Sequence, residues 1–215
     1  MPQYIQHDGR QFQVRAHRDC YETCFEVFRS QPRGKLLDIA AGAGYTSHVL
    51  KKMGFAVTAT EINTGQFLAE GVDVESVDLN QSLPYPEASF PCVVALEIIE
   101  HLEAPSRFVR EIARVLEPGG TALISTPNIT TLSSKARFLF KNEFNLFYNV
   151  PDRLHDPFDD RAGGHISPMP LWLLQHFVAE AGLSTRANAL HARADGHARQ
   201  LDFHQLDGGS QKAPG

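Results

Sequence analysis

A glycine turn, and an acid placed beyond it, carry the clearest chemistry in the sequence. Residues 36–47 read Leu-Leu-Asp-Ile-Ala-Ala-Gly-Ala-Gly-Tyr-Thr-Ser. Gly42 and Gly44 permit a tight turn that a ligand can approach closely, because glycine has no Cβ. Glu61 follows the next apolar segment, and an acid about 20 residues beyond such a turn is placed to bind ribose hydroxyls. The pattern predicts a nucleoside site at the carboxyl edge of a parallel sheet.

Asp38, at the end of the apolar run before the turn, indicates which nucleoside fits. A dinucleotide site holds a pyrophosphate at the turn and the helix N-terminus. A carboxylate about 4 Å from it would cost roughly 4 kcal/mol at an effective dielectric of about 20. Ser47 also stands where the dinucleotide pattern has its third glycine. S-adenosylmethionine fits better, because its ammonium and sulfonium are cationic. Alternatively, Asp38 is a strand-end carboxylate that only caps the turn.

A second group of reactive side chains follows in the pattern Glu-x-x-Glu-His, formed by Glu97, Glu100 and His101. If a helix begins near Glu97, these three side chains share one face. With His165 from a later loop they could hold Mg²⁺, Mn²⁺ or Co²⁺. In one alternative, Glu97 lines the cofactor pocket, Glu100 is solvated and His101 bonds locally. In another, His101 or His165 is the general base that deprotonates a substrate hydroxyl.

Helix and strand signals alternate along the chain, which predicts a parallel sheet flanked by helices. The first expected helix covers 17–30, and Gln31-Pro-Arg-Gly34 closes it. Strands are expected at 35–40, 55–60, 73–77, 92–97 and 121–126, with a helix at 105–116 between the last two. Ser167 is expected to cap a helix that ends at Gly182. Asp195-Gly196 predicts a hairpin between 184–193 and 198–206.

Composition excludes several classes of protein. The 215 residues include 42% hydrophobic and 21% charged residues, as in an ordinary globular domain. A net charge of −5 gives no general attraction to nucleic acid. No apolar run approaches the length of a membrane span, and the first residues show no signal segment. We interpret the three cysteines, Cys20, Cys24 and Cys92, as reduced core thiols and expect a cytoplasmic protein.

Five stretches together resemble a known family. They are Leu-Asp-Ile-Ala-Ala-Gly-Ala-Gly (37–44), Val-Asp-Leu (77–79), Leu-Pro-Tyr-Pro (83–86), Glu-Ile-Ile-Glu-His-Leu (97–102) and Arg-Val-Leu-Glu-Pro-Gly-Gly (114–120). In order and spacing they resemble the class I S-adenosylmethionine-dependent methyltransferases of the type 11 or type 23 subgroup, including the ubiquinone-pathway O-methyltransferases. The resemblance is close over 35–128 and looser to residue 182. The chain departs from it at Pro91-Cys92, where an Asp usually follows the Phe.

The resemblance implies a three-layer α/β fold of the Rossmann-like methyltransferase type, with a mostly parallel sheet that a C-terminal antiparallel hairpin can complete. It implies one domain over 1–206, made of a leading helix (17–34), a cofactor-binding core (35–128), a lid and acceptor segment (129–166) and a closing helix and hairpin (167–206). Residues 207–215 are expected to be a disordered tail. The aromatic and basic stretch 135–148 is expected to pack as a lid, with membrane contact as the alternative.

The resemblance also implies the cofactor contacts, at Asp38, Ala40, Gly42, Gly44, Glu61, Ile62, Asp78, Leu79 and Glu97. Asp78 matches the position that accepts from the adenine amine, although an Asp there also commonly forms an Asx turn. The expected activity is methyl transfer from S-adenosylmethionine to a nucleophilic atom, more often oxygen, of a small molecule. An RNA 2′-O-methyltransferase with a divalent metal and a non-catalytic S-adenosylmethionine-binding protein are the alternatives.

Overall fold

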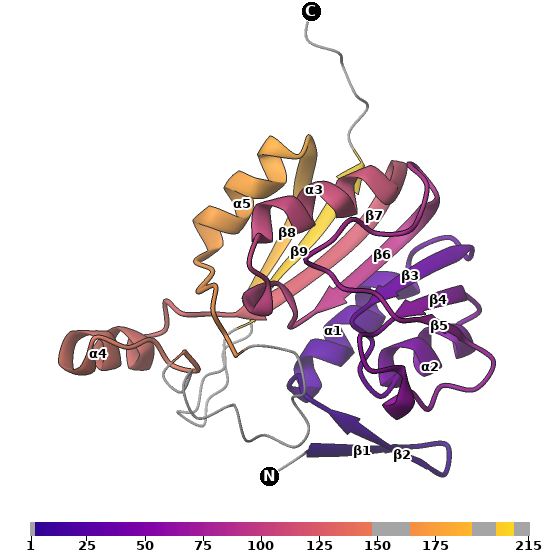
Figure 1. Ribbon diagram of the computed structural model, residues 1–215, viewed down its shortest axis with the longest axis horizontal. Coiled ribbons are helices and arrows are strands. Elements are labelled where there is room, and N and C mark those ends of the chain that lie inside the picture. The colour runs from indigo at the N-terminus through magenta and orange to yellow at the C-terminus, as the bar shows by residue number, and fades with distance from the viewer. Residues whose placement is uncertain (1–2, 148–163, 191–200, 209–215) are drawn as a thin grey trace, which may run out of the picture.

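The computed structural model describes residues 3–147, 164–190 and 201–208. Its main sheet has seven strands in the order β5-β4-β3-β6-β7-β9-β8 (Figure 1). The first five run parallel, whereas β9 is antiparallel to both β7 and β8. The strands are β3 (Lys35–Ile39), β4 (Ala56–Thr60), β5 (Asp73–Glu75), β6 (Phe90–Leu96), β7 (Leu116–Pro127), β8 (Leu183–Leu190) and β9 (Leu201–Gly208). The predicted mostly parallel α/β fold is confirmed.

Helices cover both faces of this sheet. Successive side chains of a strand point to opposite faces, so Leu36 joins a core with α1 (Arg18–Arg29) and α2 (Tyr45–Lys52). Leu37 and Ile39 join the other core, with α3 (Pro105–Val115) and α5 (Leu171–Glu180). Two short 3₁₀ helices, η1 (Thr64–Gln66) and η2 (Ile99–His101), follow β4 and β6. The result is the expected three-layer arrangement.

The helix expected to start at Ser167 begins later, and this prediction was wrong. The helix α5 starts at Leu171, with Pro170 as its N-cap residue. The Ser167 hydroxyl does not cap it; it donates to the carbonyl of Leu102 at 2.7 Å. Pro168 and Pro170 favour extended backbone before them, which delays the helix. This contact holds the preceding segment against the end of η2.

The C-terminal hairpin is present, with its strands displaced by a few residues from their predicted positions. Strand β9 pairs with β8 from Leu183↔Gly208 to Leu190↔Asp202, with an irregularity between Thr185 and Ala187. It also extends through Asp207 and Gly208, which the sequence analysis places in the tail. The predicted Asp195-Gly196 turn and residues 209–215 lie outside the described residues.

A second hairpin at the N-terminus was not expected. Strands β1 (Gln3–His7) and β2 (Arg10–Val14) pair around an Asp8-Gly9 turn. The fully buried Phe12 and the buried Val14 add to the core formed with α1 and α2. The Asp-Gly pair between alternating residues is itself a hairpin signal that could have revealed it.

The segment after β7 leaves the body of the molecule. Helix α4 (Leu132–Lys141) projects away from the sheet (Figure 1). Leu132, Leu139 and Phe140 on it are largely exposed, and Phe138 stacks on Phe144. Because 148–163 lie outside the described residues, the predicted lid stays a prediction.

Candidate functional site

The loop between β3 and α2 has the backbone conformation that the glycine turn predicts. Ala40, Gly42 and Gly44 have φ values of 56°, 57° and 86°. These angles suit glycine far better than other residues. At Gly44 a Cβ would also lie 2.8 Å from the ring of Phe67. The loop therefore passes close to its neighbours and presents backbone rather than side chains.

Glu61, directly after β4, is tied to this loop. Its Oε2 accepts from the backbone N–H of Gly42 at 2.7 Å, and its Oε1 accepts from that of Asn63 at 3.2 Å. A carboxylate can accept about four hydrogen bonds, so both oxygens retain lone pairs for further donors; the ribose role of Glu61 stays a prediction. Thr60, which the sequence analysis did not single out, receives the N–H of Ala40 on its Oγ1 at 3.3 Å.

Asp38 lies beneath the loop, on β3. Its side chain is 2% exposed, and its Oδ2 accepts from the Ser47 hydroxyl at 2.5 Å. Burial raises the pKa of Asp38 to about 7, against the opposing effect of the Ser47 hydrogen bonds and with a further rise from the charge of Glu61. The bond to Ser47 ties the strand to α2. The role of Asp38 toward the methionyl ammonium stays a prediction.

The other expected adenosine contacts follow β4 and β5. Ile62 is 40% exposed, directly after Glu61, whose N–H donates to the Glu75 carbonyl at the end of β5. Asp78 is exposed, and its Oδ1 accepts from the N–H of Asn80 at 2.9 Å. This is an Asx turn, the alternative foreseen for Asp78, and it leaves Oδ2 for another donor. Leu79 is half-buried beside it.

Glu97 occupies an unusual position at the end of β6. Its φ is 52°, a left-handed conformation that costs energy for a residue with a Cβ. Its N–H donates to the Ser125 hydroxyl at 3.0 Å, and this hydroxyl donates to Glu97 Oε1 at 2.8 Å. The Cys20 thiol lies 3.4 Å from the same hydroxyl. Ser125, at the carboxyl end of the neighbouring parallel strand, was missed from the sequence.

No α-helix begins near Glu97, so the condition under which Glu97, Glu100 and His101 would share one helix face is not met. The left-handed backbone at Glu97 precedes a single 3₁₀ turn, η2, and Leu102 is already extended. Glu97 is therefore not joined to Glu100 and His101 by the face of an α-helix. Instead its carboxylate turns to Ser125.

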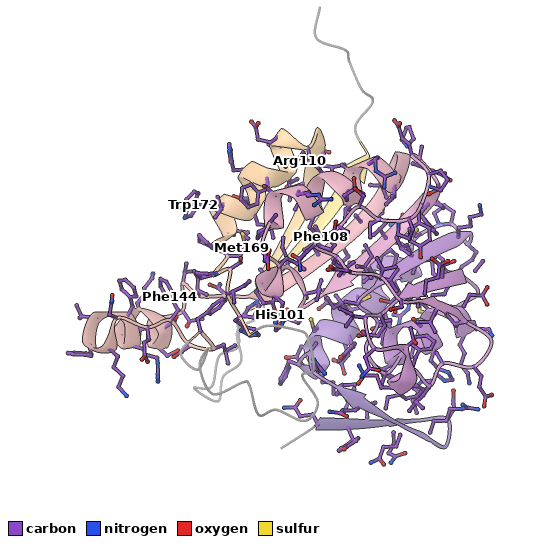
Figure 2. The ribbon with its side chains drawn as sticks, viewed as in Figure 1. His101, Phe108, Arg110, Phe144, Met169 and Trp172 are labelled. Carbon is purple, nitrogen blue, oxygen red and sulfur yellow. The ribbon has the colours of Figure 1, made fainter. Side chains whose placement is uncertain are left out.

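Glu100, His101 and His165 do come together, with their ligand atoms all within 4.8 Å of one another. The carbonyl of Glu100 accepts from the N–H groups of Ile166 and Ser167, both at 3.0 Å. This contact places the ring of His165 4.6 Å from that of His101, edge to face. His101 lies at the carboxyl end of the parallel strands, on the side from which the chain runs out to α4 (Figure 2).

The Glu100 carboxyl is fully buried in this cluster. Its Oε2 accepts from the Thr126 hydroxyl at 3.3 Å, and its Oε1 lies 4.0 Å from His165 Nε2. Over the described residues, Oε1 has no hydrogen-bond partner. Burial raises the pKa of Glu100 well above its ordinary value, and the charge of Glu97 adds to the rise. A buried acceptor without a donor is costly, so a further binding partner at Oε1 would lower that cost.

Comparison with known proteins agrees with this geometry. A family model described as "Methyltransferase domain" matches residues 12–188. The chain belongs to the class I S-adenosylmethionine-dependent methyltransferases. All the residues expected to contact S-adenosylmethionine in this methyltransferase chain lie in β3 or in the segments that follow β3, β4, β5 and β6. That is the edge at which open α/β sheets bind their ligands.

Among the relatives of this methyltransferase, the ubiquinone biosynthesis O-methyltransferase of Caulobacter vibrioides is 35% identical over 130 residues, covering 56% of this chain and 51% of that protein. The ajmaline N-methyltransferase of Rauvolfia serpentina is 34% identical over 115 residues, covering 47% and 40%. The chain thus spans about half the length of these relatives or less.

A solved structure, the [4+2]-cyclase SpnF, matches with a TM-score of 0.66 at 18% identity, covering 98% of this chain and 87% of that one. At that identity the match supports the fold alone.

All three cysteines are free and buried, as predicted. Among the described helices, none has the length and apolar character needed to cross a membrane.

Proposed function

We propose that this protein transfers a methyl group from S-adenosylmethionine to an oxygen of a small molecule. The observation that carries the proposal is the Glu61 carboxylate, held by the N–H of Gly42 at the edge of the glycine loop. In this position it can bind the ribose hydroxyls while the loop backbone faces the rest of the nucleoside. Asp38, beneath the same loop, is the acid proposed to favour the cationic methionyl end, directly or through water.

The sulfonium of the cofactor is already a good leaving group, so the protein mainly aligns the reactants and excludes water. An oxygen lone pair of the acceptor attacks the methyl carbon as the carbon–sulfur bond breaks. The electron pair of that bond stays on sulfur, which gives S-adenosylhomocysteine. If the acceptor is a hydroxyl, its proton passes to the imidazole of His101 or His165, which lie together at this edge of the sheet.

A divalent metal is the alternative way to activate a hydroxyl here, and the residues fit one. Glu100 Oε1 is buried without a hydrogen-bond partner in the described structure, and the imidazoles of His101 and His165 lie beside it. These three side chains would hold the ion. A bound metal would act as a Lewis acid that lowers the pKa of the acceptor hydroxyl. Glu97 follows β6, which pairs with the β3 strand ahead of the cofactor loop, and it precedes the η2 turn that carries Glu100 and His101.

A small molecule is the acceptor that the charge of the chain favours. The formal net charge is −5, whereas proteins that bind nucleic acid usually present a basic surface. The relatives act on different atoms by name, one being an O-methyltransferase and the other an N-methyltransferase. The paired imidazoles of His101 and His165, which can take the proton of a hydroxyl, favour oxygen as the acceptor atom.

Calorimetric titration tests the cofactor assignment. S-adenosylhomocysteine should bind and NADH should not; the reverse would overturn the assignment. Replacing Glu61 by Gln should weaken S-adenosylhomocysteine binding by about 1.5 to 3 kcal/mol, or about 10- to 150-fold, since charge-assisted hydrogen bonds are lost. The matched control is Glu87→Gln at an exposed loop position. Unchanged affinity in the Glu61 variant would refute its ribose role.

A further inference from the structure

We propose that His7, Asp8 and His48 form a binding site for a divalent transition metal of the Zn²⁺ class, which joins the N-terminal hairpin to α2. The proposal does not depend on the methyl-transfer function. These residues lie apart from the Glu100 cluster: two are at the tip of the hairpin, and the third is in the helix after the glycine loop. Their ligand atoms lie within 4.8 Å of one another.

The distances are close to those of a tetrahedral site. Asp8 Oδ2 lies 3.0 Å from His7 Nδ1 and 3.4 Å from His48 Nε2. Four ligands bound at about 2.1 Å in a tetrahedron lie about 3.4 Å apart. The two distances to Asp8 are near this value, and the two imidazole nitrogens lie within 4.8 Å of one another. His7 is partly exposed at the hairpin end, which leaves its ring room to adjust.

Both imidazoles make aromatic contacts. The ring of His48 packs 5.1 Å from that of Phe12 and 5.3 Å from that of His7. The ring of His7 also meets that of Tyr45 at 5.9 Å, edge to face. His7 Nδ1 is shielded from water yet makes no hydrogen bond within the described structure, despite its closeness to Asp8. In the neutral imidazole this nitrogen can bind a metal ion.

The ammonium group of Lys52 already lies at this site. The ammonium of Lys52 contacts the same Asp8 oxygen, and its side chain is 51% exposed. Because the Lys52 side chain is half exposed, it can turn into solvent when a metal binds, but the bound metal must first displace it from Asp8. Two imidazoles with one carboxylate suit Zn²⁺, Cu²⁺, Ni²⁺ or Co²⁺, whereas Mg²⁺ and Ca²⁺ prefer oxygen ligands. The donor set therefore selects a transition metal.

A metal bound here would link the N-terminal hairpin to α2. His48 belongs to the first turn and a half of α2, and its N–H donates to the carbonyl of Gly44 in the glycine loop at 2.9 Å. The hairpin contributes Phe12 to the core under the same helix. Binding would thus fasten the hairpin to the helix that starts at the loop, without any part in methyl transfer.

The test is zinc titration of the full chain by calorimetry, with three variants at the site. His7→Gln and Asp8→Asn should each weaken binding at this site at least about tenfold, because even outer-shell partners are worth 10- to 100-fold. Asn keeps the shape of Asp8 and tolerates its φ of 49°. Lys52→Gln should strengthen binding, because a competing cation is removed. His176→Gln, at an exposed position of α5, is the matched control and should bind zinc like the unmodified protein.

Amide hydrogen exchange separates this site from the Glu100 cluster. Zinc should slow exchange in residues 3–14 and 45–52 of the unmodified protein, and it should fail to do so in the His7 and Asp8 variants. The gain expected for Lys52→Gln cannot arise from a damaged fold. The proposal is overturned if zinc leaves exchange in 3–14 unchanged, if the His7 and Asp8 variants bind as tightly as the unmodified protein, or if Lys52→Gln brings no gain.

Discussion

Replacing Asp38 by Asn should stabilise the ligand-free fold at neutral pH while weakening cofactor binding. The carboxyl is 2% exposed and receives one side-chain hydrogen bond, from Ser47 at 2.5 Å. An Asn amide oxygen can accept the same bond without a charge. The variant therefore keeps the tie between β3 and α2 and removes the cost of a buried carboxylate.

The magnitude follows from the raised pKa. A folded-state pKa of about 7 for Asp38, against its ordinary 3.8, corresponds to about 4 kcal/mol lost from the free energy of unfolding once the group is ionised. Below about pH 4 both states are protonated, so Asp38 has no effect. Between pH 4 and 7 the folded state retains a proton that the unfolded state has released, so stability falls as pH rises. Above pH 7 the loss is complete.

Urea unfolding of the two proteins at pH 5 and pH 8 measures this effect. The advantage of Asp38→Asn should be roughly 2 to 3 kcal/mol larger at pH 8 than at pH 5. Asp73→Asn, at the exposed start of β5, is the control. In calorimetry, Asp38→Asn should bind S-adenosylhomocysteine about 1.5 to 3 kcal/mol more weakly, if the carboxylate serves the ammonium. An advantage that is equal at the two pH values, or that shrinks as pH rises, would refute the reasoning.

Three further substitutions test the loop and the core. Ala40→Gly should raise the free energy of unfolding by about 1 kcal/mol, because φ at Ala40 is 56° and non-glycine residues are strained there; a loss of stability in urea would contradict this. Gly44→Ala should lower the free energy of unfolding by about 2 kcal/mol and weaken S-adenosylhomocysteine binding, because φ is 86° and the new Cβ would meet Phe67. Unchanged binding in calorimetry would contradict the role given to the loop. Ile112→Ala, in a fully buried position of α3, should lower the free energy of unfolding by about 2 to 5 kcal/mol, measured in thermal or urea unfolding, without changing ligand affinity below the transition. A loss under about 1 kcal/mol would contradict this, because it would mean that the neighbouring core side chains fill the cavity.

The parallel sheet could be predicted because its strands are short apolar runs separated by helical patterns. Leu36 and Leu37 are both fully buried although they point to opposite faces, as expected for a strand covered on both sides. The carboxyl ends of such strands meet at one edge of the sheet. Hence Glu61 and the glycine loop could be expected to lie together from their order in the chain.

The features that could not be predicted depend on contacts between distant residues. The left-handed backbone of Glu97 is held by Ser125, which is 28 positions away in the sequence, so the residues next to Glu97 do not reveal it. The hydroxyl of Ser167 has a partner in Leu102, 65 positions away, in place of the helix it would otherwise cap. By contrast, the N-terminal hairpin carries a local Asp-Gly signal, so it is predictable from the sequence.

The order of strands at one side of the sheet constrains how the chain can assemble. Strand β9 follows β8 in the sequence, yet it lies between β7 and β8. Strand β8 therefore has no partner in the sheet until residues 201–208 have been synthesised, and β7 keeps an open edge until then. During translation the unpaired edge of β7 would be exposed to pairing with other chains. The pairing of β7 with β9 joins residues far apart in the sequence, and such pairings are slow to form. A chain cut before residue 201 should accordingly aggregate rather than fold.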